Sequence, residues 1–189
     1  FFVPGNPTGR TTSNLPDYLK NNSLPATGME SITAREIVPP ISEFATGALG
    51  LGHINIIADR DGTVRSEPLF INFEEKLFPS FALQLTLKYL NLDLQKLQLG
   101  REIKFGRKTI PVYENNKMLI SFTSGIPYYS YFDVINKKVS PDVFKDKIVI
   151  IAQSAAGLGT MQVTPTAVNV APGTIIANVI ENIINDDHL

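Results

Sequence analysis

Residues 148–178, IVIIAQSAAGLGTMQVTPTAVNVAPGTIIAN, decide the fold class of this chain. The stretch begins with a short β-branched run, IVII, after three charged residues, which is typical of a buried strand in a helix-covered sheet. Small residues then allow a sharp turn, a loop with two prolines follows, and an amphipathic helix ends the stretch. Because ligands bind where strands end in open α/β sheets, this loop is the first place to look for function.

The composition is that of one ordinary globular domain. At 189 residues and 43% hydrophobic content, the chain can bury a proper core. Its formal net charge of −1 gives no general attraction to nucleic acid or anionic lipid, so we expect no nucleic-acid partner. The sequence has no cysteine and only two histidines, which excludes thiolate chemistry and a histidine-rich metal site. We expect neither a metal nor another cofactor.

The sequence contains no obvious membrane or export signal. No apolar run approaches the roughly 20 residues that cross a bilayer, and no signal peptide opens the chain. Because the first residue is Phe1 rather than methionine, we expect the sequence to be a piece of a longer protein.

Two regions differ in character. Residues 1–45 are rich in Pro, Gly, Asn, Ser and Thr, so we expect an irregular segment packed on the domain formed by residues 46–189. That domain is predicted to open with a hairpin, whose strands at residues 53–58 and 63–73 are joined by an Asp-Arg-Asp-Gly turn at residues 59–62. The turn also resembles the start of a calcium loop, but the distal Glu ligand and flanking helices of an EF-hand are missing.

The later elements are predicted from periodicity and capping. Pro79 and Ser80 are expected to open a largely apolar helix, and a broad apolar stripe predicts a last helix at about residues 174–185. The aromatic run at residues 128–132 is expected to pack into the core. Alternating residues predict an antiparallel meander of three strands at residues 103–105, 109–113 and 118–122. Together these elements predict a single α/β domain with a mixed, largely central sheet flanked by helices.

Several motifs occur in an order that resembles a known family. They are Gly-His-Ile-Asn at residues 52–55, Asp-x-Asp-Gly-x-Val-Arg at 59–65, Pro-Ser-Phe-Ala-Leu at 79–83, Asp-Lys-Ile-Val-Ile-Ile at 146–151, Ala-Gly-Leu-Gly at 156–159, Thr-Pro at 164–165, Pro-Gly at 172–173 and Ala-Asn at 177–178. In this order and spacing they resemble the second class of CHASE domains, and the resemblance covers about residues 45–185.

The resemblance implies a sensor-type domain of a bacterial membrane receptor, facing the periplasm or extracellular space and tethered by transmembrane helices outside this sequence. Relatives are joined to adenylate or guanylate cyclases, histidine or Ser/Thr kinases, or diguanylate cyclase-type modules. The resemblance further implies that the domain is not itself catalytic, that it binds an unidentified small molecule, and that it acts as a homodimer. The chain departs from the family at Ala152, Thr160 and Ile176, where relatives often have Gly, Asp and His.

The alternative is a soluble α/β small-molecule-binding enzyme domain. The Gly-x-Gly at residues 157–159 is not followed by the Gly-Lys-Ser/Thr of a phosphate-binding loop. Ser154 lacks a Gly-x-Ser-x-Gly elbow, and His53 lies in a predicted strand where we expect it to be packed. We therefore assign no catalytic residue.

Five polar residues are candidates for ligand binding: Arg65, Ser154, Thr160, Thr164 and Asn178. The Arg65 guanidinium could hold an anionic ligand bidentately, or it could pair with the aspartates of the 59–62 turn, which we favour. The hydroxyl and amide groups of the other four could line a polar pocket or satisfy turn backbone. Likewise, the apolar stripe of the last helix could pack against a second copy of the chain or against its own sheet.

Overall fold

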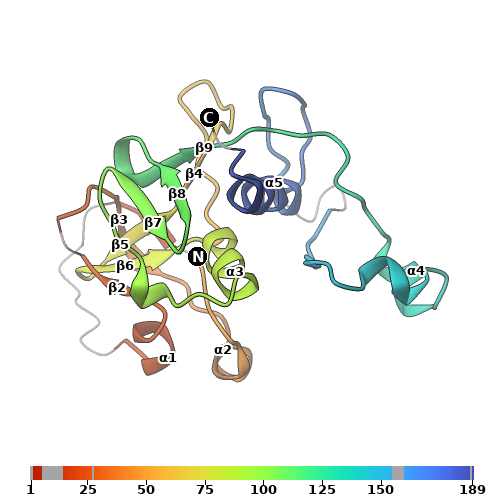
Figure 1. Ribbon diagram of the computed structural model, residues 1–189, viewed down its shortest axis with the longest axis horizontal. Helices are drawn as coiled ribbons and strands as arrows, with labels where there is room; N and C mark the ends of the chain where they lie inside the picture. The colour runs from red at the N-terminus through yellow and green to blue at the C-terminus, as the bar shows by residue number, and fades with distance from the viewer. Residues whose placement is uncertain (1, 6–14, 27, 155–159, 188) are drawn as a thin grey trace.

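The computed structural model describes residues 2–5, 15–26, 28–154, 160–187 and 189. Strands lie on one side of the molecule, helices α3 and α5 lie against them, and α4 stands apart on the other side (Figure 1). Helices and mixed sheets in one small domain confirm the predicted α/β class.

The main sheet has five strands in the order β1-β3-β5-β6-β2. Only β3 and β5 run parallel, while the other neighbours are antiparallel, so the sheet is mixed as predicted. Three of the five strands come from the first 37 residues. The strands are β1 (Phe2–Pro4), β2 (Leu24–Pro25), β3 (Ile32–Ile37), β5 (Phe70–Phe73) and β6 (Lys76–Pro79).

Two smaller antiparallel pairs replace the predicted three-stranded meander. Strands β7 (Glu102–Phe105) and β8 (Lys108–Pro111) form the expected hairpin around Gly106. Strand β9 (Lys117–Leu119) instead pairs with β4 (Ser66–Pro68), far away in the sequence. The strand positions were therefore predicted well, but the partner of the third strand was wrong.

Helices α3 (Phe81–Tyr89) and α5 (Pro172–Asn185) form as their apolar periodicity predicts, and Ser80 caps α3 by accepting a hydrogen bond from the Leu83 amide. The two helices pack on each other, and the stripe on α5 is buried in its own core rather than left free. The remaining helical segments are short: α1 (Asp17–Lys20), α2 (Ser42–Gly47), α4 (Tyr131–Ile135), and the 3-10 turns η1 (Leu94–Lys96), η2 (Glu114–Asn116) and η3 (Pro141–Phe144).

The Gly-His-Ile-Asn motif joins β1 to the start of α3. His53 forms a parallel bridge with Ser80, donating its amide to the Pro79 carbonyl and accepting from the Phe81 amide. Asn55 spans both backbone groups of Phe2: its Oδ1 accepts from the Phe2 amide at 2.8 Å and its Nδ2 donates to the Phe2 carbonyl at 2.7 Å. The predicted strand at residues 53–58 is otherwise absent.

The predicted central strand at residues 148–151 is wrong, because this segment adopts no regular secondary structure. Ile148 and Ile150 are half-buried against the main core, whereas Val149 is 52% exposed and Ile151 80% exposed. The side chains thus alternate as in a strand, but no described strand hydrogen-bonds to them. The tight turn expected at residues 155–159 lies outside the described residues.

The aromatic run at residues 128–132 was predicted to be core, and this prediction is also wrong. Its residues flank or begin α4, which Figure 1 shows to one side of the body between two long connections. Neither hydrophobic core cluster of the described residues includes this segment, so its large side chains stay at the surface. Those more than 40% exposed are Tyr128, Tyr129, Tyr131 and Phe132.

Candidate functional site

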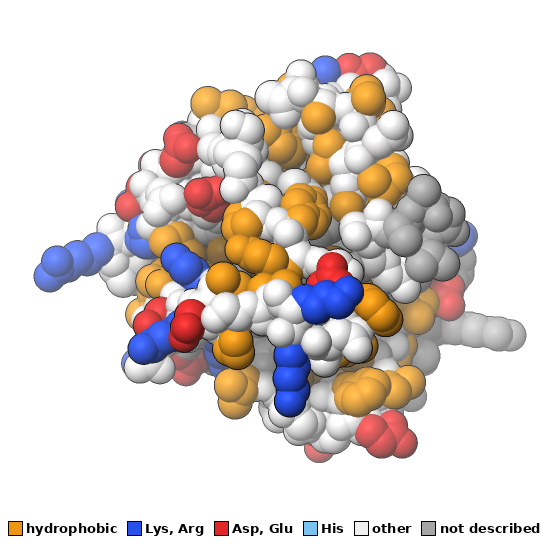
Figure 2. Space-filling view, turned by 90° about the vertical axis from the view of Figure 1, so that its right-hand side faces the viewer, with side chains coloured by type: hydrophobic (Ala, Val, Ile, Leu, Met, Phe, Trp, Pro, Cys, Tyr) orange, Lys and Arg blue, Asp and Glu red, His pale blue; other side chains and the backbone are white. Residues whose placement is uncertain are grey.

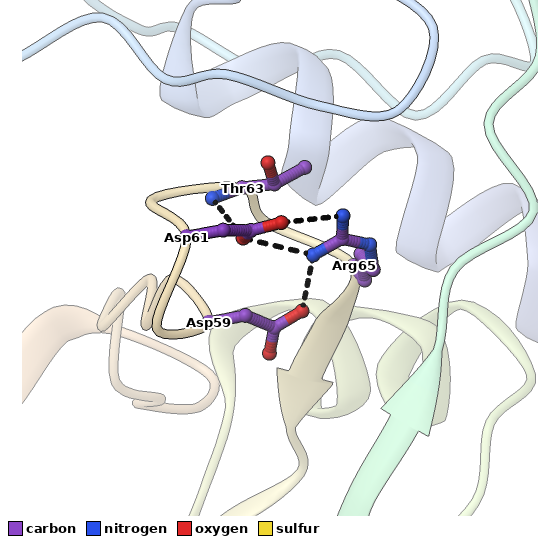
Figure 3. A network of polar contacts seen from close by, with 4 residues as sticks. All are labelled: Asp59, Asp61, Thr63 and Arg65. Atoms are coloured by element: carbon purple, nitrogen blue, oxygen red, sulfur yellow. Dashed lines mark hydrogen bonds and ion pairs between the residues drawn. The ribbon is translucent and has the colours of Figure 1, made fainter.

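Arg65 is held by the turn that precedes it (Figure 3). The turn closes through hydrogen bonds from the Gly62 amide to the Asp59 carbonyl and from the Asp59 amide to the Thr63 carbonyl. Arg65 Nη1 then donates to Asp59 Oδ2 at 2.9 Å, while Nη1 and Nη2 bind the two oxygens of Asp61 at 3.0 and 2.8 Å. The predicted pairing with the turn is therefore confirmed.

This network also shifts the pKa values of Asp61 and Arg65. Hydrogen bonds from Arg65, and then from the Thr63 backbone, lower the pKa of Asp61, while hydrogen bonds to Asp61 and Asp59 raise the pKa of Arg65. The guanidinium is thus engaged by two carboxylates of its own chain. Its role toward a ligand stays a prediction.

Asn178, another predicted ligand contact, holds the segment that follows β9. Its Oδ1 accepts from the Thr123 amide at 2.8 Å, and its Nδ2 donates to the Thr174 carbonyl one turn earlier on α5. One turn later, Asn182 accepts from the Ser121 amide at 2.9 Å and donates to the Ser121 carbonyl at 3.0 Å. Both asparagines are almost fully buried, so α5 fixes this segment through side-chain amides.

The other three candidates differ in their surroundings. Thr164 is buried and uses its hydroxyl within its own turn, donating to the Ala167 carbonyl and accepting from the Ala167 amide. Ser154 and Thr160 have exposed side chains on either side of the undescribed segment. No hydrogen bond or ion pair between described residues joins any two of the five candidates, so the structure does not bring them together through direct contacts.

A buried polar cluster was not predicted as a site. His53, Glu67 and Ser80 are 3%, 2% and 0% exposed. Burial raises the pKa of Glu67 to about 8, although a hydrogen bond with Ser80 opposes the shift, and burial lowers the pKa of His53 to about 3. Both side chains are therefore mainly neutral at pH 7. Ser, His and Glu are the residue types of a hydrolase triad, but here they lie in the interior and Ser80 caps α3.

Two cavities lie on the side of the molecule that carries α1 and α2. The smaller cavity has a volume of about 60 Å³ and is lined mainly by apolar residues. Its lining includes Phe2 of β1, residues 37–40 and His53. The larger, about 290 Å³, is a polar cleft between α1, α2 and the C-terminal half of α3. None of the five predicted site residues lines either cavity. No local sequence pattern predicts the cleft, because its walls come from segments that lie far apart in the chain.

We expect Glu67 to make the fold less stable as the pH rises. Between pH 4.5, the ordinary carboxyl value, and about 8, the folded chain keeps a proton on Glu67 that the unfolded chain releases, so stability falls across this window. His53 acts oppositely between pH 3 and 6.5, where the unfolded chain takes up a proton that the folded chain does not. Of these two groups, only Glu67 changes the stability above pH 6.5. Between pH 6.5 and pH 8 it should lower the free energy of unfolding by about 2 kcal/mol.

Substitution of Glu67→Gln should therefore abolish the alkaline loss of stability, because the amide cannot release a proton. Urea unfolding at pH 6.5 and again above pH 8 measures the difference for each variant. Glu114→Gln, on the surface, is the matched control and should retain the wild-type decline. An equal decline in Glu67→Gln would show that another group is responsible.

The described residues contain no group of three or more acidic or histidine side chains placed to hold a metal ion. None of the helices in the described part of the chain combines the length and hydropathy needed to cross a bilayer. The described residues thus form an α/β domain with a mixed sheet and an open polar cleft between α1, α2 and α3.

A comparison with protein families identifies the family of this domain. The family model of the CHASE2 domain matches residues 6–189, nearly the whole chain, so the chain belongs to this family. CHASE2 domains are sensory domains of signalling receptors. No curated protein and no solved structure matches the sequence. The family match starts in the N-terminal segment, whose strands are part of the main sheet.

Proposed function

We propose that this chain is the extracytoplasmic domain of a bacterial transmembrane receptor, that it detects a small molecule, and that it passes the signal to a cytoplasmic cyclase or kinase. The observation that carries the proposal is the family match over residues 6–189, since the family consists of sensory domains. In this proposal the domain is not itself an enzyme. Membrane attachment comes from helices outside the sequence, and the domain faces the periplasm or extracellular space.

The proposed route of the signal runs through α5. This helix packs on α3 and, through Asn178 and Asn182, holds the segment that leads from β9 to α4. A ligand that shifts α5 would therefore also move residues 121–123, from which the chain continues to α4. We retain Arg65, Ser154, Thr160 and Thr164 as proposed contacts of the ligand, together with Asn178.

We also propose that the receptor domain pairs with a second copy. The α5 stripe is buried in its own core, so the surface around α4 is the better candidate for the contact. Figure 2 views the molecule from the α4 side, and hydrophobic side chains lie across this face. The exposed large side chains in and before α4 are Tyr128, Tyr129, Tyr131 and Phe132. Exposed hydrophobic patches mark interaction surfaces.

Labelling of introduced cysteines in whole cells tests the topology. The chain has no cysteine of its own, so Ser154→Cys places one exposed thiol in the domain, and Ser66→Cys places a buried one as the control. In the full-length receptor, we expect a membrane-impermeant maleimide to label Ser154→Cys in intact cells and Ser66→Cys only after denaturation. Labelling of Ser154→Cys only after lysis would place the domain in the cytoplasm and overturn the proposal.

A further inference from the structure

The polar cleft of about 290 Å³ is the most promising binding site in the described part of the chain. Figure 1 shows α1 and α2 next to each other at the bottom of the view, with α3 above them. The cleft lies between these three helices and the residues that follow α3. Its lining combines side chains from α1, α2 and α3 with Asp93 and Leu94.

The wall formed by α3 contains a buried amide that lacks a full set of partners. Gln84 is 4% exposed, and its Nε2 donates to Asn22 Oδ1 at 2.9 Å. Asn22 Oδ1 also accepts from the Leu51 amide, and its Nδ2 donates to the Tyr18 carbonyl. Gln84 Oε1 has no hydrogen-bond partner among the described residues. A buried acceptor without a partner is unfavourable. This oxygen is itself buried beneath the cleft surface, so the charged side chains of the lining are the groups that a ligand meets.

Two opposite charges stand on the same cleft. Lys88 lies one turn after Gln84 on the same face of α3, and it forms no ion pair with any described residue. Asp93 uses Oδ1 to cap the Gln95 amide, which leaves its other oxygen available. The two side chains do not form a salt bridge with each other. A cleft lined by one cation and one anion is complementary to a molecule that carries both charges.

We propose that this cleft binds a small zwitterion with a free ammonium and a free carboxylate, the size of an amino acid or a dipeptide. Lys88 receives the carboxylate and Asp93 receives the ammonium. The cavity volume lies just below the range of typical small-molecule pockets, which suits a ligand of this size. None of the five residues retained above lines this cleft, so the zwitterion is proposed as a further ligand of the domain.

Calorimetry on the 189-residue chain tests the ligand class directly. The probes are the free amino acids and glycylglycine, each compared with its N-acetylated and its C-amidated form. We expect saturable binding of at least one zwitterion, and a loss of about tenfold or more in affinity when either charge is blocked. If no zwitterion binds, or if the blocked forms bind equally well, the proposal is wrong.

Three substitutions then locate the site. Lys88→Ala should weaken binding about tenfold and remove the discrimination against the C-amidated probe, while Asp93→Asn should do the same for the N-acetylated probe. Lys96→Ala changes an exposed lysine outside the cleft lining and should leave affinity unchanged. Unchanged affinity in both Lys88→Ala and Asp93→Asn would place the ligand elsewhere. Because these measurements use the isolated chain, they can fail while the cell-labelling result stands, and the reverse is equally possible.

Discussion

Substitution of Gly52→Ala is expected to lower the free energy of unfolding by about 3 kcal/mol. A Cβ atom at Gly52 would lie 2.6 Å from the Phe81 amide nitrogen and Cα, and 2.7 Å from the Ser80 carbonyl carbon. All three are backbone atoms at the start of α3, so no side-chain rotation relieves the clash. The helix would have to separate from the segment that carries His53, at the expense of the hydrogen bonds between them.

The measurement is urea unfolding of the purified chain, with Gly47→Ala as the control. Gly47 ends α2, and a Cβ built there meets no atom within 4 Å. Alanine at this helical position should therefore be neutral or stabilise the chain by up to about 1 kcal/mol. If Gly52→Ala were as stable as Gly47→Ala, the close packing of the Gly-His motif against α3 would be refuted.

Substitution of Asn182→Ala should cost roughly 2–3 kcal/mol in the free energy of unfolding. The substitution removes both hydrogen bonds to the Ser121 backbone and leaves its amide and carbonyl without these partners. It also removes a side chain that is 0% exposed at the contact between α5 and the segment after β9. Hydrogen exchange should show faster exchange of the Ser121 amide, since its acceptor is gone.

Asn185→Ala is the matched control, because it changes the same residue type on the same helix at an exposed position. Its effect should stay within about 0.5 kcal/mol. Equal stabilities of the two alanine variants would mean that the Asn182 contacts do not hold the segment in solution.

The features predicted correctly from the sequence are mostly local ones. Helices α3 and α5 follow from apolar periodicity, the β7–β8 hairpin from two alternating runs around a glycine, and the 59–62 turn from residues that favour turns. The strand predicted at residues 148–151 is absent because a β-branched run indicates strand propensity but not the presence of a neighbouring strand. The pairing of β4 with β9 is missed for the same reason.

The same difference between local and long-range contacts applies to the candidate site residues. The pairing of Arg65 with Asp61 is predictable because the two residues are four apart around a turn. The bonds of Asn178 to Thr123 and of Asn182 to Ser121 are not, because these partners come from a segment more than 50 residues away. The burial of Glu67 and the formation of the cleft depend on how whole elements pack, which the residue pattern of one segment does not contain.

The paired hydrogen bonds of Asn55 protect the main sheet from unwanted assembly. Strand β1 is at the edge of the five-stranded sheet, where free amide and carbonyl groups would invite a strand from another molecule. Asn55 occupies both groups of Phe2, so part of this edge is already paired within the chain. Asn182 does the same for Ser121, two residues beyond β9. Each of these two side-chain amides thus satisfies the backbone groups of one residue that would otherwise be free to pair with another strand.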